Sequence, residues 1–97
     1  MPQLQKLYLF DNALGEAGGV ALGEAIGTGA VPQLQRLVLA NNALGERGAA
    51  TLAAAIRSKT LPELAKMDVE RTSLGAEGRR QLEEAAQEIG GALEVVF

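Results

Sequence analysis

A pattern of apolar positions organises the chain and returns at a constant spacing of thirty residues. It reads Leu-x-x-Leu-x-Leu-x-x-Asn-x-Leu-Gly, beginning at Leu4 and again at Leu34. A third, altered copy begins at Leu64. Residues 1–30 and 31–60 are identical at fifteen of thirty positions. Repetition at a period of this size predicts supersecondary units that stack on one another to bury a shared core.

Each copy opens with a short strand. Leu7 and Leu9 have apolar equivalents in every copy, whereas the position between them, Tyr8, changes character freely. Because successive side chains of a strand point to opposite faces, the constant set is expected in the core and the variable set on the exposed face. The strands predicted in this way are parallel and cover residues 6–9, 36–39 and 66–69.

An amphipathic helix follows each strand. In the first copy, apolar or small residues recur at i, i+4, i+7 and i+8 from Gly18 to Ile26, which defines one helical face. Gly15 supplies the backbone freedom of the turn before the helix. We expect Gly18, and Gly48 in the second copy, to let each helix lie close to a neighbouring strand. The predicted helices cover residues 16–26, 46–57 and 76–89.

The last copy has the features of a terminal repeat, namely a decayed motif and a polar outer surface. Its predicted helix is longer, and Gly90-Gly91 ends it. Leu93–Phe97 is expected to form a short fourth strand. The outer face of the helix carries Arg79, Arg80, Glu83, Glu84 and Glu88, and we interpret these charges as solvated. The predicted organisation is one domain, 1–97, with repeats 1–30, 31–60 and 61–90 and a C-terminal cap with its strand over 91–97.

The first copy has the same core residues as the second but no preceding neighbour in the sequence. Its strand would be an open edge with little charge beyond Lys6, a configuration that invites pairing with another chain. Two arrangements would cover this edge. Either further repeats lie upstream, or two copies of the chain self-associate and continue the sheet across a two-fold axis.

The motif, with its continuation Gly-Glu-x-Gly into a helix, resembles the leucine-rich repeat and is similar to the ribonuclease-inhibitor-like subclass. That subclass includes Ran GTPase-activating proteins and the sensor arrays of nucleotide-binding immune receptors. The resemblance implies an α/β fold, a right-handed βα solenoid with a parallel sheet on its concave side and helices on its convex side. It also implies that Asn12 and Asn42 lie inside the turns and hydrogen-bond neighbouring backbone. The period exceeds the usual length of about 20–29 residues, and Thr72 replaces the third asparagine.

Composition argues against several function classes. The chain has no histidine and no cysteine, and neither Ser58 nor Ser73 has an activating base nearby in sequence. The glycines of residues 15–19 lack the lysine and the serine or threonine of a phosphate-binding loop. The net charge of −3 gives no reason to expect nucleic acid, and no apolar stretch suits a membrane span. We therefore expect no enzymatic activity, cofactor or metal. The missing cysteines and signal peptide favour a cytoplasmic location.

The exposed sheet face is the candidate for binding. Lys6, Arg36 and Lys66 should form a basic row across it, and two of the chain's three aromatic residues lie beside this row. Aromatic and arginine side chains are typical anchors of protein interfaces. The alternative is a solvated face on which Tyr8 merely packs against Val38. With the strand-to-helix turns, the candidate residues are Lys6, Tyr8, Phe10, Asp11, Arg36, Val38, Asn41, Lys66, Asp68, Glu70 and Arg71.

Asp68 and Glu70 should project from one face of the third strand, where they could meet a cation. Lys66 and Arg71 flank them, so local charge pairing is the expectation. The favoured function is a protein-interaction module at the C-terminal part of a longer leucine-rich-repeat array. The alternatives are a GTPase-activator-like regulator, by analogy of fold alone, and a structural subunit held in a larger assembly by its ends.

Overall fold

The computed structural model describes residues 3–90 and 92–97. Three strand–turn–helix units follow one another, and we call them the first, second and third units. They consist of β1 (Lys6–Tyr8) and α1 (Gly15–Ile26), β2 (Arg36–Val38) and α2 (Gly45–Arg57), and β3 (Lys66–Asp68) and α3 (Gly75–Glu88). The strand β4 (Glu94–Val96) follows α3. Gly91, expected to help end the last helix, lies outside the described residues.

The four strands form one parallel sheet in the order β1-β2-β3-β4. Equivalent positions of the units are directly paired, as Leu7 with Leu37 and Leu37 with Met67. The predicted strands and their parallel pairing are confirmed, although each of the first three strands is one residue shorter than predicted and β4 is two residues shorter than expected. The predicted helices are also confirmed, with ends that differ by one residue or less. The protein is thus α/β, with a parallel sheet and three helices.

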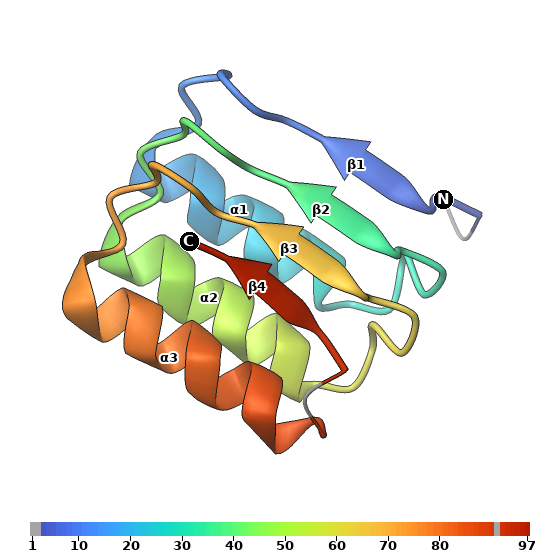
Figure 1. Ribbon diagram of the computed structural model, residues 1–97. Coiled ribbons are helices and arrows are strands. Elements are labelled where there is room, and N and C mark those ends of the chain that lie inside the picture. Colours follow the sequence, from blue (N-terminus) through green and yellow to red (C-terminus); the bar gives the residue numbers. More distant parts are fainter. Residues whose placement is uncertain (1–2, 91) are drawn as a thin grey trace.

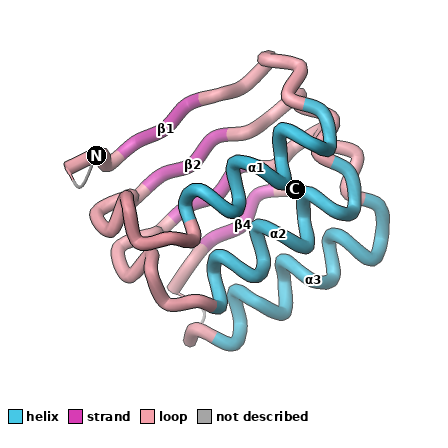
Figure 2. Tube along the Cα trace, turned by 180° about the vertical axis from the view of Figure 1, so that it is seen from behind, coloured by secondary structure: helices cyan, strands magenta, loops and turns pink. Residues whose placement is uncertain are grey.

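All three helices lie on one side of the sheet, and the other face of the sheet is bare (Figures 1 and 2). The core fills the space between the two layers. Leu37 and Leu39 are fully buried there, whereas Val38 between them is only half-buried. The predicted buried and exposed faces of the strands are therefore confirmed for β2.

Small residues bring adjacent helices close together. A Cβ added to Gly48 of α2 would lie 3.7 Å from the Cα of Gly19 in α1. A Cβ added to Gly78 of α3 would lie 3.0 Å from the Cβ of Ala49 in α2. The expectation that Gly18 and Gly48 accommodate a neighbouring strand is therefore wrong. Gly48 lies against the preceding helix, and the atoms nearest to a Cβ on Gly18 belong to Leu14.

The glycine that leads from the turn into the helix has the same backbone conformation in each unit. Gly15, with φ of 69°, recurs as Gly45 and Gly75 with φ of 70° and 71°. This left-handed conformation costs glycine no steric strain, as the sequence predicts. The turns also hold a buried side chain, Asn42 in the second unit and Thr72 in the third. Asn12, expected inside the first turn, is exposed, and its Nδ2 donates a hydrogen bond to the carbonyl of Phe10.

The two ends of the sheet differ in burial. Leu4, Leu7, Leu9 and Leu22 of the first unit are only half-buried, although their equivalents in the second unit are fully buried. Ala25, expected on the buried face of α1, is exposed, whereas its equivalent Ala55 is buried. The difference arises because the second unit is covered on both sides and the first on one. None of the helices in residues 3–90 and 92–97 is long and apolar enough to cross a membrane.

Candidate binding surface

The face of the sheet opposite the helices, here called the open face, is built from the variable positions of the strands. Lys6, Arg36 and Lys66 are paired in register and form the predicted basic row, which Glu94 of β4 extends with an acid. Lys6 and Arg36 are exposed, and Lys66 is half-buried. The parallel ladder therefore places three cationic side chains side by side at one end of the open face.

Tyr8 and Phe10 are the exposed large hydrophobic residues of the described chain. Each keeps about half of its surface in solvent, 48% for Tyr8 and 51% for Phe10. Nη1 of Arg36 donates a hydrogen bond to the phenolic oxygen of Tyr8 at 3.3 Å, which orients the ring beside the basic row. Tyr8 is paired with Val38, so the two side chains are neighbours across the sheet. That contact leaves half of the tyrosine surface uncovered and available to a partner.

The acidic side of the open face lies on β3 and just beyond it. Oδ1 of Asp68 accepts a hydrogen bond from the backbone N–H of Glu70 at 3.0 Å. Neither acid forms an ion pair with Lys66 or Arg71 in the described part of the chain, so the expectation of local charge pairing is wrong. The short aspartate side chain instead bonds the backbone two residues further on, as it commonly does where a strand ends. The open face thus runs from basic and aromatic on β1 and β2 to acidic on β3.

Three further candidates occupy one equivalent position in the turns after the strands. Asp11, Asn41 and Arg71 are exposed and have φ of 60°, 61° and 55°. Aspartate and asparagine tolerate this left-handed conformation, whereas an ordinary L-residue pays about 1–2 kcal/mol. Arg71 is therefore a strained residue, and strain of this kind is commonly retained at functional sites.

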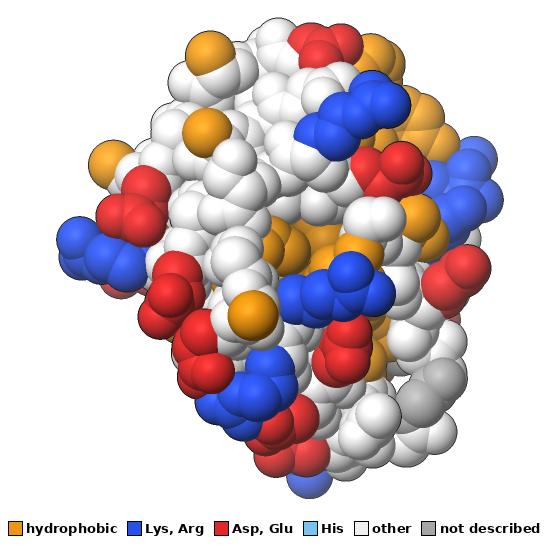
Figure 3. All heavy atoms as spheres, turned by 60° about the vertical axis from the view of Figure 1, so that its left-hand side comes forward, with side chains coloured by type: hydrophobic (Ala, Val, Ile, Leu, Met, Phe, Trp, Pro, Cys, Tyr) orange, Lys and Arg blue, Asp and Glu red, His pale blue; other side chains and the backbone are white. Residues whose placement is uncertain are grey.

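A hollow that was not predicted from the sequence lies next to Arg71. Its volume is about 440 Å³, within the range of about 300–1,000 Å³ typical of ligand pockets. In Figure 3 an apolar hollow opens on the side of the turns, with charged side chains around it. The guanidinium of Arg79 lies 4.6 Å from the ring centre of Phe97 and pairs with Glu83 at 3.0 Å. The residues that line the hollow are Val69, Arg71, Thr72, Ser73, Leu74, Gly75, Ala76, Arg79 and Phe97.

Arg79 and Phe97 were missed for an identifiable reason. From the sequence, Arg79 is expected among the solvated charges of the last helix and Phe97 only as part of a strand. The equivalents of Arg79 are Gly19 and Ala49, both buried against the next helix. A large cation at a position that is small and buried in the other units was the signal that could have identified it.

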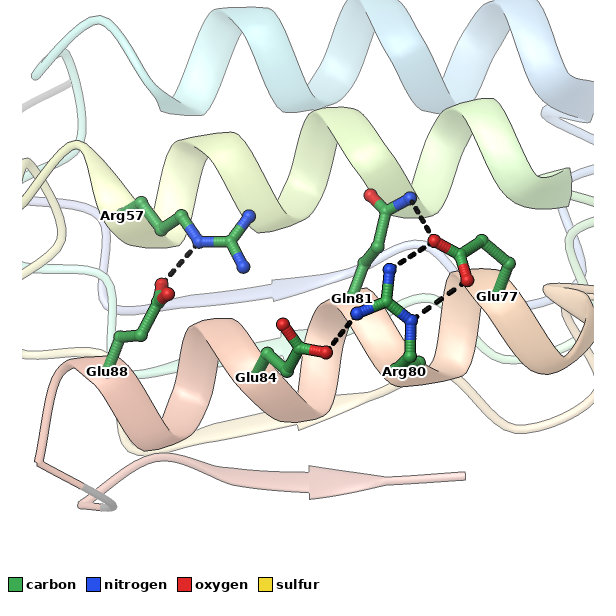
Figure 4. Close-up of polar contacts among 6 residues, drawn as sticks. All are labelled: Arg57, Glu77, Arg80, Gln81, Glu84 and Glu88. Carbon is green, nitrogen blue, oxygen red and sulfur yellow. Dashed lines mark hydrogen bonds and ion pairs between the residues drawn. The ribbon is translucent and has the colours of Figure 1, made fainter.

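The outer surface of the helices has a different character. Arg57 of α2 pairs with Glu88 of α3, and Arg80 bridges Glu77 and Glu84 within α3 (Figure 4). The hydrogen bond from Arg80 lowers the pKa of Glu77, and a weaker bond from Gln81 adds to it. These charges satisfy one another in solvent, which agrees with their prediction as a solvated face.

The described residues include no cluster of three or more acidic, histidine or cysteine side chains that could hold a metal ion. Comparison of the chain with protein-family models, with curated proteins and with solved structures finds no match. The arrangement of the open face and the hollow is therefore the basis for a functional assignment.

Proposed function

We propose that this chain is a protein-interaction module, a solenoid of the leucine-rich-repeat type, that binds a protein partner through its open sheet face. In such a solenoid the open face is the concave one. The observation that carries the proposal is the exposed Tyr8, hydrogen-bonded to Arg36, with the exposed Phe10 two residues further along the chain. Exposed aromatic rings next to an arginine are the composition of interface hot spots rather than of an ordinary wet surface.

The charge pattern of the open face indicates what the partner should present. The row of Lys6, Arg36 and Lys66 favours acidic groups, whereas Asp68 and Glu70 favour basic groups. A matching partner carries an apolar site for the two aromatic rings, an acidic region for the basic row and a basic region for the two acids, of which Asp68 lies across Val38 from Tyr8. Complementarity of this kind selects a partner and its orientation more than it adds affinity.

The rigid frame beneath the open face supports the same proposal. The apolar residues that alternate with Lys6 and Tyr8 anchor each strand in the core. The binding side chains therefore project from regular strands whose positions are set by the sheet, so little ordering is required when a partner binds. Preorganisation of this sort reduces the entropic cost of association.

The proposal is tested by mutating the open face and the outer helical face in parallel. The intact protein serves as bait for cross-linking and mass spectrometry, and each partner is then titrated against purified variants. We expect Tyr8→Ala and Phe10→Ala each to remove about 2 kcal/mol of binding free energy, or about thirtyfold in Kd, with an unchanged circular dichroism spectrum. Arg36→Glu should weaken binding by more than either of these alanine substitutions does.

The matched control replaces charged residues on the outer helical face. Arg80→Ala and Glu84→Ala remove an exposed ion pair without touching the open face, and binding should stay within twofold of wild type. If these control substitutions weaken binding more than the open-face substitutions do, the open face is not the binding site.

A further inference from the structure

The hollow beside Arg71 is lined by two cationic side chains and, among the described residues, by no acidic one. Arg71 is exposed, and its guanidinium has no ion-pair or hydrogen-bond partner within residues 3–90 and 92–97. Arg79 uses only its Nε, which donates to Glu83 at 3.0 Å. The Nη groups of Arg79 and the whole guanidinium of Arg71 are therefore available to an anion.

The backbone of the same turn adds donors beside these cations. In the second unit, the N–H of Asn41 donates to the carbonyl of Glu70 at 3.0 Å, and that of Gly45 donates to a carbonyl of the next turn at 3.2 Å. Their equivalents in the third unit, Arg71 and Gly75, have no acceptor in the described part of the chain. Both residues line the hollow. Backbone N–H groups beside a guanidinium are suitable donors for a carboxylate.

Arg79 prevents the hollow from being covered as the other turns are. Its equivalents, Gly19 and Ala49, are small and lie against the following helix. A helix cannot approach an arginine as closely as it approaches glycine or alanine. The guanidinium of Arg79 instead lies 4.6 Å from the ring centre of Phe97, and the arginine side chain is 60% exposed. The hollow therefore has an apolar ring and a cation side by side in its wall.

The remaining lining indicates what kind of anion fits. Val69, Leu74 and Phe97 contribute apolar surface to a hollow of about 440 Å³, which is far more than the roughly 30 Å³ that a water molecule occupies. The space therefore suits an anion joined directly to an apolar group. At the C-terminus of a protein, the carboxylate and the last side chain branch from the same Cα atom. In aspartate and glutamate the carboxylate ends the side chain, and no apolar group lies beside it.

We propose that the hollow binds the C-terminus of a partner protein whose last residue is apolar. The terminal carboxylate pairs with Arg71 and Arg79 and accepts a hydrogen bond from the N–H of Gly75. The last side chain packs against Leu74 and Phe97. Capture of a terminal carboxylate by backbone N–H groups is a recurring mode of peptide recognition. This site is separate from Tyr8 and its surroundings, so it does not depend on the function proposed for the open face.

The test is an NMR titration of the full chain with the peptide acetyl-Gly-Gly-Leu, which has a free terminal carboxylate. The amides of Arg71 and Gly75 and the methyl groups of Leu74 should show the largest, saturable shifts. The C-terminal amide of the same peptide should bind about ten- to hundredfold more weakly, because it lacks the charge that the donors recognise. Acetyl-Gly-Gly-Gly keeps the carboxylate but loses the apolar side chain, and it should bind about tenfold more weakly.

Arg71→Asn is the decisive variant. Asn41 occupies the equivalent position with a similar φ, 61° against 55°, so the substitution preserves the turn. It should weaken binding of acetyl-Gly-Gly-Leu by about tenfold, and denaturation should show no loss of stability. Arg80→Gln is the matched control, because Arg80 lies next to Arg79 in sequence but pairs with acids of the outer helical face. Its affinity should stay within about twofold of wild type.

Several results would overturn the proposal. They are the absence of saturable shifts at Arg71 and Gly75, equal binding of the free acid and its amide, and unchanged affinity of Arg71→Asn. Inorganic phosphate or acetyl-Gly-Glu-Gly-amide binding as tightly as the free acid would show a general anion site instead. Tyr8→Ala should leave the titration unchanged, so the failure of this proposal and that of the proposed function are distinguishable.

Discussion

Replacement of Asn42 by alanine is the most direct test of how the units are joined. The side chain is fully buried and makes hydrogen bonds on both sides of a unit boundary. Alanine leaves the carbonyl of Leu39 without the amide donor that it has in the buried turn. The carbonyl of Leu9 loses its donor as well, while the N–H groups of the outer turn can recover some hydration at the exposed Asn12.

An unsatisfied buried polar group costs about 1–3 kcal/mol, and part of that cost is relieved where the turn meets solvent. We therefore expect Asn42→Ala to lower the free energy of unfolding by about 2–3 kcal/mol. Urea denaturation followed by circular dichroism measures this quantity, and an unchanged m-value would show that the unfolding remains comparable. Asn12→Ala is the matched control and should cost less than about 0.5 kcal/mol, because its amide makes one exposed bond. Equal effects of the two substitutions would refute the assignment of Asn42 as the link between units.

Three further predictions concern the core, a strained turn and the outer ion pairs. Leu37→Ala should lower the free energy of unfolding by about 2–5 kcal/mol, since Leu37 is fully buried between two units; a loss below about 0.5 kcal/mol would contradict the register. Arg71→Asn should raise stability by about 1 kcal/mol because asparagine tolerates the left-handed turn, and Asn41→Arg should lower it similarly; urea denaturation of both variants checks this, and a destabilised Arg71→Asn would disprove the strain. Arg80→Met should raise the pKa of Glu77 in an NMR titration, because the first cause of its lowering is the bond from Arg80. Since the folded-state pKa of Glu77 is lowered, the stability from this pair is present above the ordinary glutamate pKa and is lost as pH falls through the folded-state value; an unchanged titration of Glu77 would contradict it.

The repeat period is the reason that the strands, helices and sheet register followed from the sequence. Each apolar position recurs in three copies of the motif. The recurrence of leucine at Leu7 and Leu37 therefore identifies the buried face, which a single strand of three residues would not be enough to identify. The same equivalence between copies predicts that Lys6, Tyr8 and Arg36 lie together on the open face, as they do. The faces of the strands were therefore predicted from the equivalence between copies and not from the local propensity of single residues.

The equivalence between copies does not indicate which helix or strand a given residue contacts. Gly48 is small in a helix, but its sequence position does not state whether a strand or a helix approaches it. Asp68 has nearby cations in sequence, yet its side chain bonds the closer backbone N–H of Glu70. The contact between Arg79 and Phe97 joins a helix to a strand that follows it, and it depends on the tertiary arrangement around the hollow. The contact of Gly48 arises between units, that of Arg79 between a helix and the strand after it, and that of Asp68 within one turn, and the repeated pattern specifies none of them.

In the proposed function, stability and binding depend on alternate residues of the same short strands. Leu37 is fully buried and its neighbours Arg36 and Val38 face the open side, so a change at one set leaves the other in place. The open-face positions differ between units, as Tyr8, Val38 and Asp68 do, without altering the pairing of the strands. Substitutions on the open face should therefore change partner affinity at nearly constant unfolding free energy, whereas Leu37→Ala should do the reverse. A variant of Tyr8 that lost binding only in proportion to lost stability would show that the two faces are not independent.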